Sequence, residues 1–171
     1  MKGIAFIGMP GAGKSVVGKK LSIQIGWKFI DLDDYILETQ KTHHHDFMMA
    51  NGEQALMDLE NELTLSLDLA DTIFSPPGSI VYSRQAMDKI KKDTFVVYIK
   101  VSLEEVKKHL GDKINRNGII GLREKGIEGL FKERTPLYEA YADLILDTQG
   151  LDLEVKIKKT FEELKAMNVF S

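Results

Sequence analysis

The chain contains no cysteine, which excludes disulfide bonds and thiolate metal sites and removes the usual mark of a small secreted domain. No apolar run approaches the roughly 18 residues of a membrane span, and the first one is too short for a signal peptide. The net charge of −3 shows no large excess of either sign, so it predicts no attraction to nucleic acid or acidic membranes. We therefore expect a soluble cytoplasmic protein, a monomer that binds neither nucleic acid nor membranes.

The chain does have enough apolar residues for one core: 43% of its 171 residues are hydrophobic, and this length predicts one domain spanning residues 1–171. Short apolar runs alternate with helix-like segments, which predicts an α/β fold with a parallel sheet. Strands are expected at 4–7, 27–31, 72–75, 94–101 and 142–148. Helices are expected at 16–25, 32–40, 53–70, 84–92, 102–111, 131–141 and 151–167, with a glycine-rich basic flap at 112–129.

The segment Gly8-Met9-Pro10-Gly11-Ala12-Gly13-Lys14-Ser15 matches the pattern G-x-x-x-x-G-K-[ST] of a phosphate-binding loop. Glycine is favoured where backbone N–H groups must approach a phosphate chain closely and a side chain would clash. Lys14 can reach the β- and γ-phosphates, and Ser15 can offer its hydroxyl to Mg²⁺. The alternative is a glycine-rich turn between two core elements. We predict a bound nucleoside triphosphate with Mg²⁺.

The order of further motifs resembles the shikimate kinase family of small P-loop kinases over nearly the whole chain. These motifs are Asp31-Leu32-Asp33, Gly52-Glu53, a glycine-containing turn after the third strand, an arginine-bearing flap and Arg134-Thr135-Pro136-Leu137-Tyr138. The resemblance implies a P-loop NTPase three-layer α/β/α fold with a five-stranded parallel sheet in the order 2-3-1-4-5. It also implies a helical substrate-binding insert at about 32–60 and a lid at about 111–127.

The resemblance implies an ATP-dependent phosphotransferase that phosphorylates a hydroxyl of a small acceptor, with shikimate as the first candidate. Lys14 and a lid arginine, Arg116, would act on the transferred phosphate, with Arg123 as the fallback. Asp31 would assist Ser15 in binding Mg²⁺, and Asp33 would hold or deprotonate the acceptor hydroxyl. A carboxylate at the carboxyl end of a strand suits that role, although acids also favour a helix start through its dipole.

Other residues are implied to bind the nucleotide or the substrate. The nucleotide contacts implied are Gly8, Gly11, Ala12, Gly13, Lys14, Ser15, Val16 and, for the adenine, His109. Arg134 would bind a substrate carboxylate through its bidentate fork, and Gly78 would lie against the substrate. Each has a plainer alternative: His109 as a solvated residue near a helix end and Arg134 as a surface residue.

Three departures from the family pattern lie on the acceptor side, and the first is that Pro76-Pro77-Gly78-Ser79 stands where the family has a glycine triplet against the substrate, so the floor of the pocket must differ. Met57 stands where the family has a second carboxylate-binding arginine, and His44 stands at an apolar position of the pocket. Losing one charge-assisted contact costs about 1.5–3 kcal/mol, which permits weak use of shikimate or a different acceptor. The alternatives are another small polyol, a hydroxy acid or a nucleotide.

Two questions stay open in the sequence: the role of the run from His43 to His45, and whether the chain belongs to a class other than the kinases. Consecutive histidines on a helix point in different directions, so they cannot converge on one metal, and they mark either an exposed helix start or a contact of His44 with substrate. A nucleotide-dependent switch lacks its base-reading Asn-Lys-x-Asp motif in this chain. A non-catalytic ATP-binding protein is permitted by Met57 but opposed by the intact Lys14, Ser15, Asp31 and Asp33.

Overall fold

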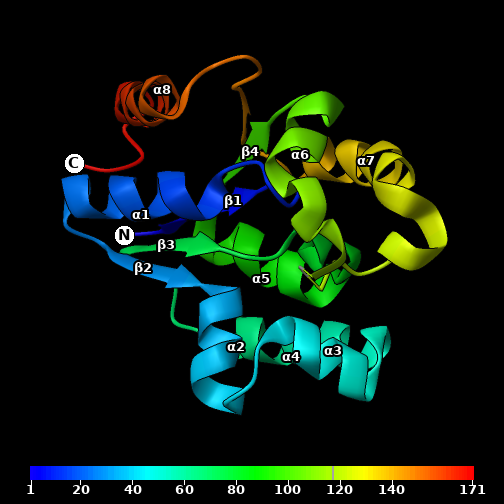
Figure 1. Cartoon of the computed structure of the whole chain (residues 1–171). Coiled ribbons are helices and arrows are strands. Elements are labelled where there is room, and N and C mark those ends of the chain that lie inside the picture. Colours follow the sequence, from blue (N-terminus) through cyan, green and yellow to red (C-terminus); the bar gives the residue numbers. More distant parts are fainter. Residues whose placement is uncertain (117) are drawn as a thin grey trace.

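The computed structural model describes the backbone of residues 1–116 and 118–171, and every side chain in these ranges except those of Lys113, Asn115 and Arg116. A parallel sheet runs through the molecule in the order β2-β3-β1-β4-β5, as predicted (Figure 1). Its strands are β1 (Gly3–Ile7), β2 (Lys28–Asp31), β3 (Thr72–Ser75), β4 (Thr94–Lys100) and β5 (Leu144–Asp147).

Helices connect the strands and cover the sheet. The α-helices are α1 (Lys14–Ile25), α2 (Leu32–Gln40), α3 (His44–Asn51), α4 (Glu53–Ser66), α5 (Arg84–Asp93), α6 (Leu103–Leu110), α7 (Leu122–Tyr141) and α8 (Leu153–Ala166). Two short 3₁₀ helices, η1 (Gly78–Tyr82) and η2 (Gly111–Arg116), follow β3 and α6. Within the described ranges, none of these helices combines the length and apolar character needed to cross a bilayer.

The core lies on both faces of the central strands. Every residue of β1 is buried, because α1 and α8 pack above the sheet in Figure 1 while α5 packs below it. Strands buried on both faces are nearly continuous apolar runs, as β1 and β4 are. The helices α2, α3 and α4 project together beyond the end of β2, opposite α6 and the start of α7 (Figure 1).

Two predicted boundaries are wrong. Helix α4 ends at Ser66 and not at Ala70, because Leu67 has an extended backbone and Leu67 and Leu69 are both buried, a spacing of two. Helix α7 begins at Leu122 and not at Phe131, so much of the predicted flap is helical. Gly126 has a non-helical backbone, with φ of 65° and ψ of 169°, and it kinks α7 between two helical segments. The loop predicted after β3 also contains the short 3₁₀ helix η1.

The predicted capping box at the start of α6 is confirmed. The Ser102 hydroxyl accepts a hydrogen bond from the backbone N–H of Glu105, whose carboxylate accepts one from the backbone N–H of Ser102. Helix α7 also runs through Pro136 without interruption there, as expected. Local sequence signals therefore placed most elements, and the errors fall where a local pattern suits more than one structure.

Candidate active site

The loop between β1 and α1 lies at the carboxyl end of the central strand, where open α/β sheets bind ligands. At Gly8, φ is +150° and an added Cβ would lie 2.8 Å from the carbonyl oxygen of Ile99, so any side chain would collide with β4. Gly13 has φ of +91° and no described atom within 4 Å of an added Cβ. The left-handed backbone at Gly13 therefore favours glycine by itself, in addition to any close approach of a phosphate.

Lys14 is the first residue of α1, and its side chain turns back over the loop. Its Nζ donates hydrogen bonds to the carbonyl oxygens of Gly8 and Met9, each at 2.9 Å. Burial lowers the pKa of Lys14 to about 8, and the nearby carboxylates of Asp33 and Asp31 oppose this shift. The ammonium group therefore sits close to the loop backbone with two acids facing it, ready to meet an anion.

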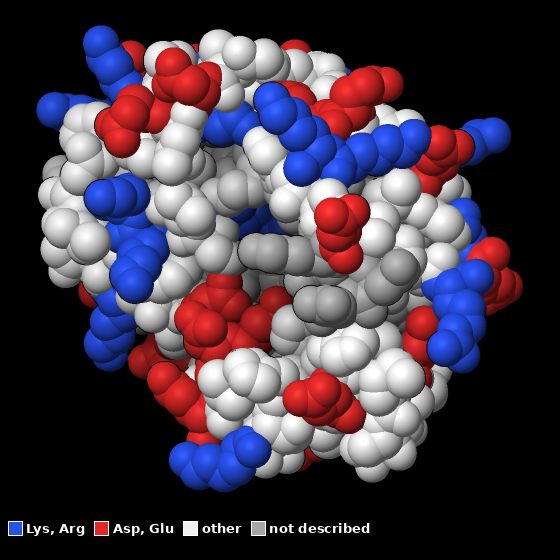
Figure 2. Space-filling view, viewed as in Figure 1, with Lys and Arg blue, Asp and Glu red and all other residues white. Residues whose placement is uncertain are grey.

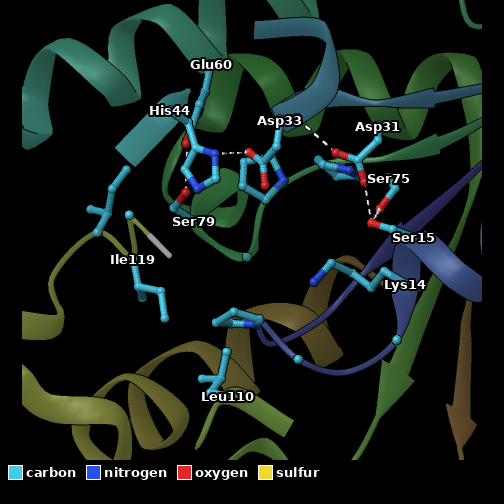
Figure 3. A pocket seen from close by; sticks show the side chains of 18 of the residues that line it. Lys14, Ser15, Asp31, Asp33, His44, Glu60, Ser75, Ser79, Leu110 and Ile119 are labelled. Atoms are coloured by element: carbon cyan, nitrogen blue, oxygen red, sulfur yellow. Dashed lines mark hydrogen bonds and ion pairs between the residues drawn. The ribbon is translucent and has the colours of Figure 1, made fainter. Parts of the chain in front are cut away.

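Three oxygen-bearing side chains gather beside the loop. The Ser15 hydroxyl donates a hydrogen bond to Asp31 Oδ2 and lies 3.1 Å from the hydroxyl of Ser75 at the end of β3 (Figure 3). Asp31 also caps α2, because its Oδ1 accepts a hydrogen bond from the backbone N–H of Asp33 at 2.9 Å. Sequence reasoning proposed Ser15 and Asp31 for the metal, and it missed Ser75.

These donors fit Mg²⁺. Magnesium is a hard cation that is usually bound by one or two carboxylates together with substrate phosphates. Within the described part of the chain, no cluster of three or more His, Asp and Glu side chains forms a metal site by itself. A magnesium site that nucleotide phosphates complete needs few protein ligands, and the carboxylate of Asp31 with the hydroxyls of Ser15 and Ser75 can supply them.

Asp33 lies in the first turn of α2 and faces the same space. Its Oδ1 is buried and accepts no hydrogen bond from a described residue, while His44 Nδ1 from α3 lies 3.6 Å away. Burial raises the pKa of Asp33, with the proximity of His44 opposing and that of Asp31 reinforcing the shift. Figure 3 shows the imidazole and the carboxylate pointing toward each other across the cavity wall. A ligand hydroxyl could therefore satisfy the buried Oδ1.

A single cavity of about 310 Å³ joins the phosphate loop to Asp33. Figure 2 shows this face of the molecule hollowed near its centre, with acidic side chains at the rim of the hollow and basic ones within it. The lining contains the predicted residues Gly11, Gly13, Lys14, Ser15, Val16, Asp31, Asp33, His44, Gly78 and Arg134. It also contains Pro10, Glu60, Ser75, Pro76, Pro77, Ser79, Leu110, Gly118, Ile119 and Ile120.

The part of this cavity around Asp33 and Arg134, away from the phosphate loop, is called the acceptor half. It holds a buried pair of residues that sequence reasoning missed. Glu60 of α4 is 3% exposed, and its Oε2 accepts a hydrogen bond of 2.9 Å from the hydroxyl of Ser79 in η1. Burial raises the pKa of Glu60 to about 8, which the hydrogen bond from Ser79 opposes. A glutamate one turn after Met57 resembles any other helix acid in sequence, so only its packing reveals it.

Arg134 of α7 also lines the cavity, but it is 1% exposed and partly bound by the protein itself. Its Nη2 donates to the carbonyl oxygen of Ile120 at 2.7 Å, and its Nε donates to the hydroxyl of Tyr82 at 3.2 Å. The ring of Tyr82 lies 5.1 Å from the guanidinium carbon, within the range of a cation–π contact. Arg134 is therefore an interior residue, and the surface alternative is wrong.

A second cavity of about 350 Å³ adjoins the outer side of the phosphate loop. The predicted nucleotide contacts Ala12, Val16 and His109 line it together with residues 151–153 and Lys156, which sequence reasoning missed. His109 Nδ1 lies 2.7 Å from the carbonyl oxygen of Gly11, so α6 is tied to the loop. The geometry places His109 where a base attached to a loop-bound phosphate chain could lie.

The lid closes over the acceptor half of the first cavity. Gly118 has φ of +59°, and a Cβ there would lie 2.6 Å from Cδ2 of His44 and 2.9 Å from Cα of His45. The backbone N–H of Gly121 donates to Glu53 Oε1 at 3.0 Å, which joins the lid to α4. The predicted lid arginine, Arg116, has its side chain outside the described residues.

The structure does not bring every predicted residue to the cavity. Gly8 supports the phosphate loop from beneath and is absent from the described lining of both cavities. Met57 is half-buried, packs against the core and likewise does not appear in the described lining of the first cavity. Helix α4 therefore presents Glu60, and not the residue at the predicted arginine position, to the substrate space.

Comparisons with known proteins agree with this architecture. The sequence profile of the family described as shikimate kinase matches residues 10–165. The shikimate kinase of Dictyoglomus turgidum is 30% identical over 167 residues, which cover 95% of this chain and 96% of that protein. The shikimate kinase of Clostridium beijerinckii is 32% identical over 145 residues, or 84% of this chain and 83% of that protein.

Solved structures show the same fold. A shikimate kinase from Acinetobacter baumannii in complex with shikimate has a TM-score of 0.85 at 22% identity, covering 99% of this chain and 96% of that one. A deoxyadenosine kinase from M. mycoides with bound dCTP has a TM-score of 0.61 at 16% identity, covering 95% and 98%. The matched profile, the curated relatives and the sheet order lead to one conclusion: this chain belongs to the shikimate kinase family and is a small-molecule kinase.

Proposed function

We propose that this protein transfers the γ-phosphate of ATP, with Mg²⁺, to a hydroxyl of a small acceptor bound between Asp33 and Arg134. One observation carries the proposal: Lys14, Asp33 and Arg134 line the same cavity, so a phosphate chain and an acceptor would meet there. Shikimate is the first candidate, because a relative of the same fold was solved with it. Another polyol, a hydroxy acid or a nucleotide is the alternative. We further propose a cytoplasmic monomer.

The donor half would bind ATP through the loop and through Lys14. ATP supplies the phosphoryl group, and Mg²⁺ held with Ser15 and Asp31 would neutralise charge on its phosphates. Lys14 would leave the carbonyl oxygens of Gly8 and Met9 and turn toward the β- and γ-phosphates. The positive end of α1 would add to this attraction. His109 and Val16 would contact the base.

In the acceptor half, Asp33 would orient the acceptor hydroxyl and take its proton as the oxygen attacks phosphorus. Burial raises the pKa of Asp33, which makes its carboxylate a stronger base than an exposed aspartate. His44, 3.6 Å from Asp33, would help to hold that carboxylate in place. The lid, resting on His44 and His45 through Gly118, would exclude water that could otherwise attack ATP. Arg116 is proposed to contact the transferred phosphate.

The test is acceptor-dependent formation of ADP, measured with a coupled assay, with the phosphorylated product identified by ³¹P NMR. Lys14→Ala should lower phosphoryl transfer by about 10²- to 10³-fold, because it removes the charge facing the γ-phosphate. Lys19→Ala, on the exposed face of the same helix, is the matched control and should retain activity. Full activity of a folded Lys14→Ala protein, checked by circular dichroism, would overturn the proposal.

A further inference from the structure

A buried lysine lies in the wall of the second cavity, beside the phosphate loop. Lys156 belongs to α8, which packs against α1 (Figure 1), and only 4% of its surface is exposed. It lines this cavity of about 350 Å³ together with Val16 of α1 and His109 of α6. Lysine is almost never fully buried unless its ammonium group is paired, so a buried lysine in a cavity wall indicates a partner.

The protein itself supplies no close partner for this charge. Within the described part of the chain, the ammonium group of Lys156 makes no hydrogen bond or ion pair. Burial acts to raise the pKa of Glu105, but hydrogen bonds from Ser102 and Gly150 and the charge of Lys156 outweigh it and lower that pKa. The carboxylate of Glu105 is held by the backbone N–H groups of Ser102 and Gly150, at 2.8 and 3.0 Å. Lys156 therefore acts on Glu105 only through space.

The position of Lys156 in its helix does not favour a cation. Helix α8 begins at Leu153, so Lys156 is its fourth residue and lies near the positive end of the helix dipole, where acids are stabilising and cations are not. Helical side chains lean toward the N-terminus of their helix, which directs Lys156 toward residues 151–153 in the same cavity wall. Helix stability therefore does not account for this charge.

The remaining wall of the second cavity suits a flat heteroaromatic ring. Val16 and Leu153 both line it, and they are 46% and 43% exposed although both are apolar. His109 adds an imidazole ring. Apolar side chains can cover the faces of a base, whereas an ammonium group only donates hydrogen bonds and needs an acceptor at the edge of the ring. A purine offers both, because its ring nitrogens are acceptors.

We propose that Lys156 recognises the base of ATP by donating a hydrogen bond to one ring nitrogen of adenine. This inference rests on the proposed function, which puts the phosphate chain in the loop and the base in the second cavity. It adds the residue that binds the edge of the base. Lys156 contributes to ATP affinity, and neither acceptor binding nor the chemical step depends on it. A base without an acceptor at that edge leaves the buried ammonium unpaired and binds more weakly.

Lys156→Met tests the contact, because methionine has a similar length and carries no charge. The dissociation constant of ATP with Mg²⁺, measured by calorimetry, should rise by about tenfold, while KM for the acceptor changes by less than about twofold. Lys158→Met, exposed on the same helix, is the matched control and should bind ATP as the wild type does.

Thermal unfolding without nucleotide distinguishes a ligand contact from a structural one. Removing a buried charge that has no partner should leave the protein equally stable or make it more stable. Removing a charge that stabilises α8 against Glu105 should instead lower the unfolding temperature. ATP should raise the unfolding temperature less in Lys156→Met than in the wild type, because the variant binds it more weakly.

Analogues of ATP locate the acceptor atom. In 1-deaza-, 3-deaza- and 7-deaza-ATP, one ring nitrogen of adenine is replaced by C–H. One of these analogues should bind the wild type about tenfold more weakly than ATP does. The same analogue and ATP should bind Lys156→Met equally well, because the variant has already lost the donor of that hydrogen bond.

The outcomes separate this inference from the proposed function. Unchanged ATP affinity in a folded Lys156→Met protein, with ATP bound by the wild type, overturns the inference and leaves the kinase function standing. Effects of the variant and of every analogue that simply add together also overturn it. A wild-type protein that binds no ATP contradicts the proposed function and the inference together.

Discussion

The donor and acceptor halves of the cavity are built in different ways. The donor half is built mainly from consecutive residues, the loop after β1 and the start of α1 with Lys14 and Ser15, to which β2 and β3 add Asp31 and Ser75. The acceptor half takes Asp33 from α2, Glu60 from α4, Ser79 from η1 and Arg134 from α7. A contiguous loop can keep its chemistry while the surrounding chain changes. An assembled pocket changes its chemistry with a single substitution or a small shift in packing.

The two halves also differ in what holds their charged side chains before a ligand binds. On the donor side, Lys14 Nζ donates to two carbonyl oxygens, of Gly8 and Met9, which a phosphate can replace. On the acceptor side, Arg134 is held by Tyr82 and Ile120, and Glu60 by Ser79, so the polar groups are bound to one another before any ligand arrives. The donor half is poised for an anion, whereas the acceptor half is closer to electrical balance. Substitutions in each half test this contrast.

The largest effect is expected from Asp33→Asn, which should separate the two halves kinetically. Loss of the base should lower kcat by about 10²- to 10⁴-fold while changing ATP affinity by less than about twofold. Steady-state kinetics and calorimetric titration of ATP measure the two quantities. Asp34→Asn, exposed on the same helical turn, is the control. A wild-type turnover number for Asp33→Asn would remove Asp33 from the acceptor site.

Glu60→Gln should change how stability depends on pH. The pKa of Glu60 is raised from 4.5 to about 8 on folding, so between these values the folded chain retains a proton that the unfolded chain has lost. This contribution to stability is complete below pH 4.5 and is lost as pH rises through 8. Glutamine does not titrate. As pH rises from 5 to 8, the free energy of unfolding of the wild type should therefore fall relative to that of Glu60→Gln.

Urea unfolding at pH 5 and pH 8 measures this difference, which we expect to be on the order of 2 kcal/mol. Glu62→Gln should keep the pH dependence of the wild type, because its side chain is exposed. Parallel stability profiles for wild type and Glu60→Gln would contradict a buried, shifted carboxyl at this position and weaken the contrast between the two halves.

Gly118→Ala should affect the acceptor half and leave the donor half intact. The added methyl group would lie 2.6 Å from the His44 ring, so the lid could not rest on α3, and KM for the acceptor should rise by about tenfold. Gly126→Ala is a close control, since φ there is also positive, at +65°, but no described atom lies within 4 Å. Equal effects of the two variants would show that backbone strain, and not the contact with His44, is responsible.

The smallest effect is expected from Tyr82→Phe, which removes the hydroxyl that accepts a hydrogen bond from Arg134 Nε and donates one to Glu133 at 2.7 Å. Loss of this support should raise KM for the acceptor by about two- to tenfold and leave KM for ATP unchanged. Tyr141→Phe, on α7 and away from the described cavity lining, is the control. An equal rise in KM for ATP would mean that Arg134 serves both halves.

Much of the fold could be predicted from sequence because its signals are local. The apolar runs gave the five strands, and the phosphate loop and Asp31-Leu32-Asp33 were placed correctly because each is a few consecutive residues at the end of a strand. The end of α4 was missed because Leu67 and Leu69 continue an apolar pattern that suits either a helix or an extended segment. The start of α7 was missed because Gly126, which kinks the helix, suggested a loop where a short helical segment precedes it.

The sequence by itself determined the donor chemistry, because a phosphate-binding loop needs only the order and conformational freedom of adjacent residues. Only the tertiary structure decided the acceptor chemistry. Whether α4 presents Met57 or Glu60 to the cavity depends on how that helix packs, and whether Arg134 is available depends on Tyr82 and Ile120, distant in the chain. Burial and long-range hydrogen bonds set the charges in the acceptor half of the cavity, and no local sequence pattern predicts them.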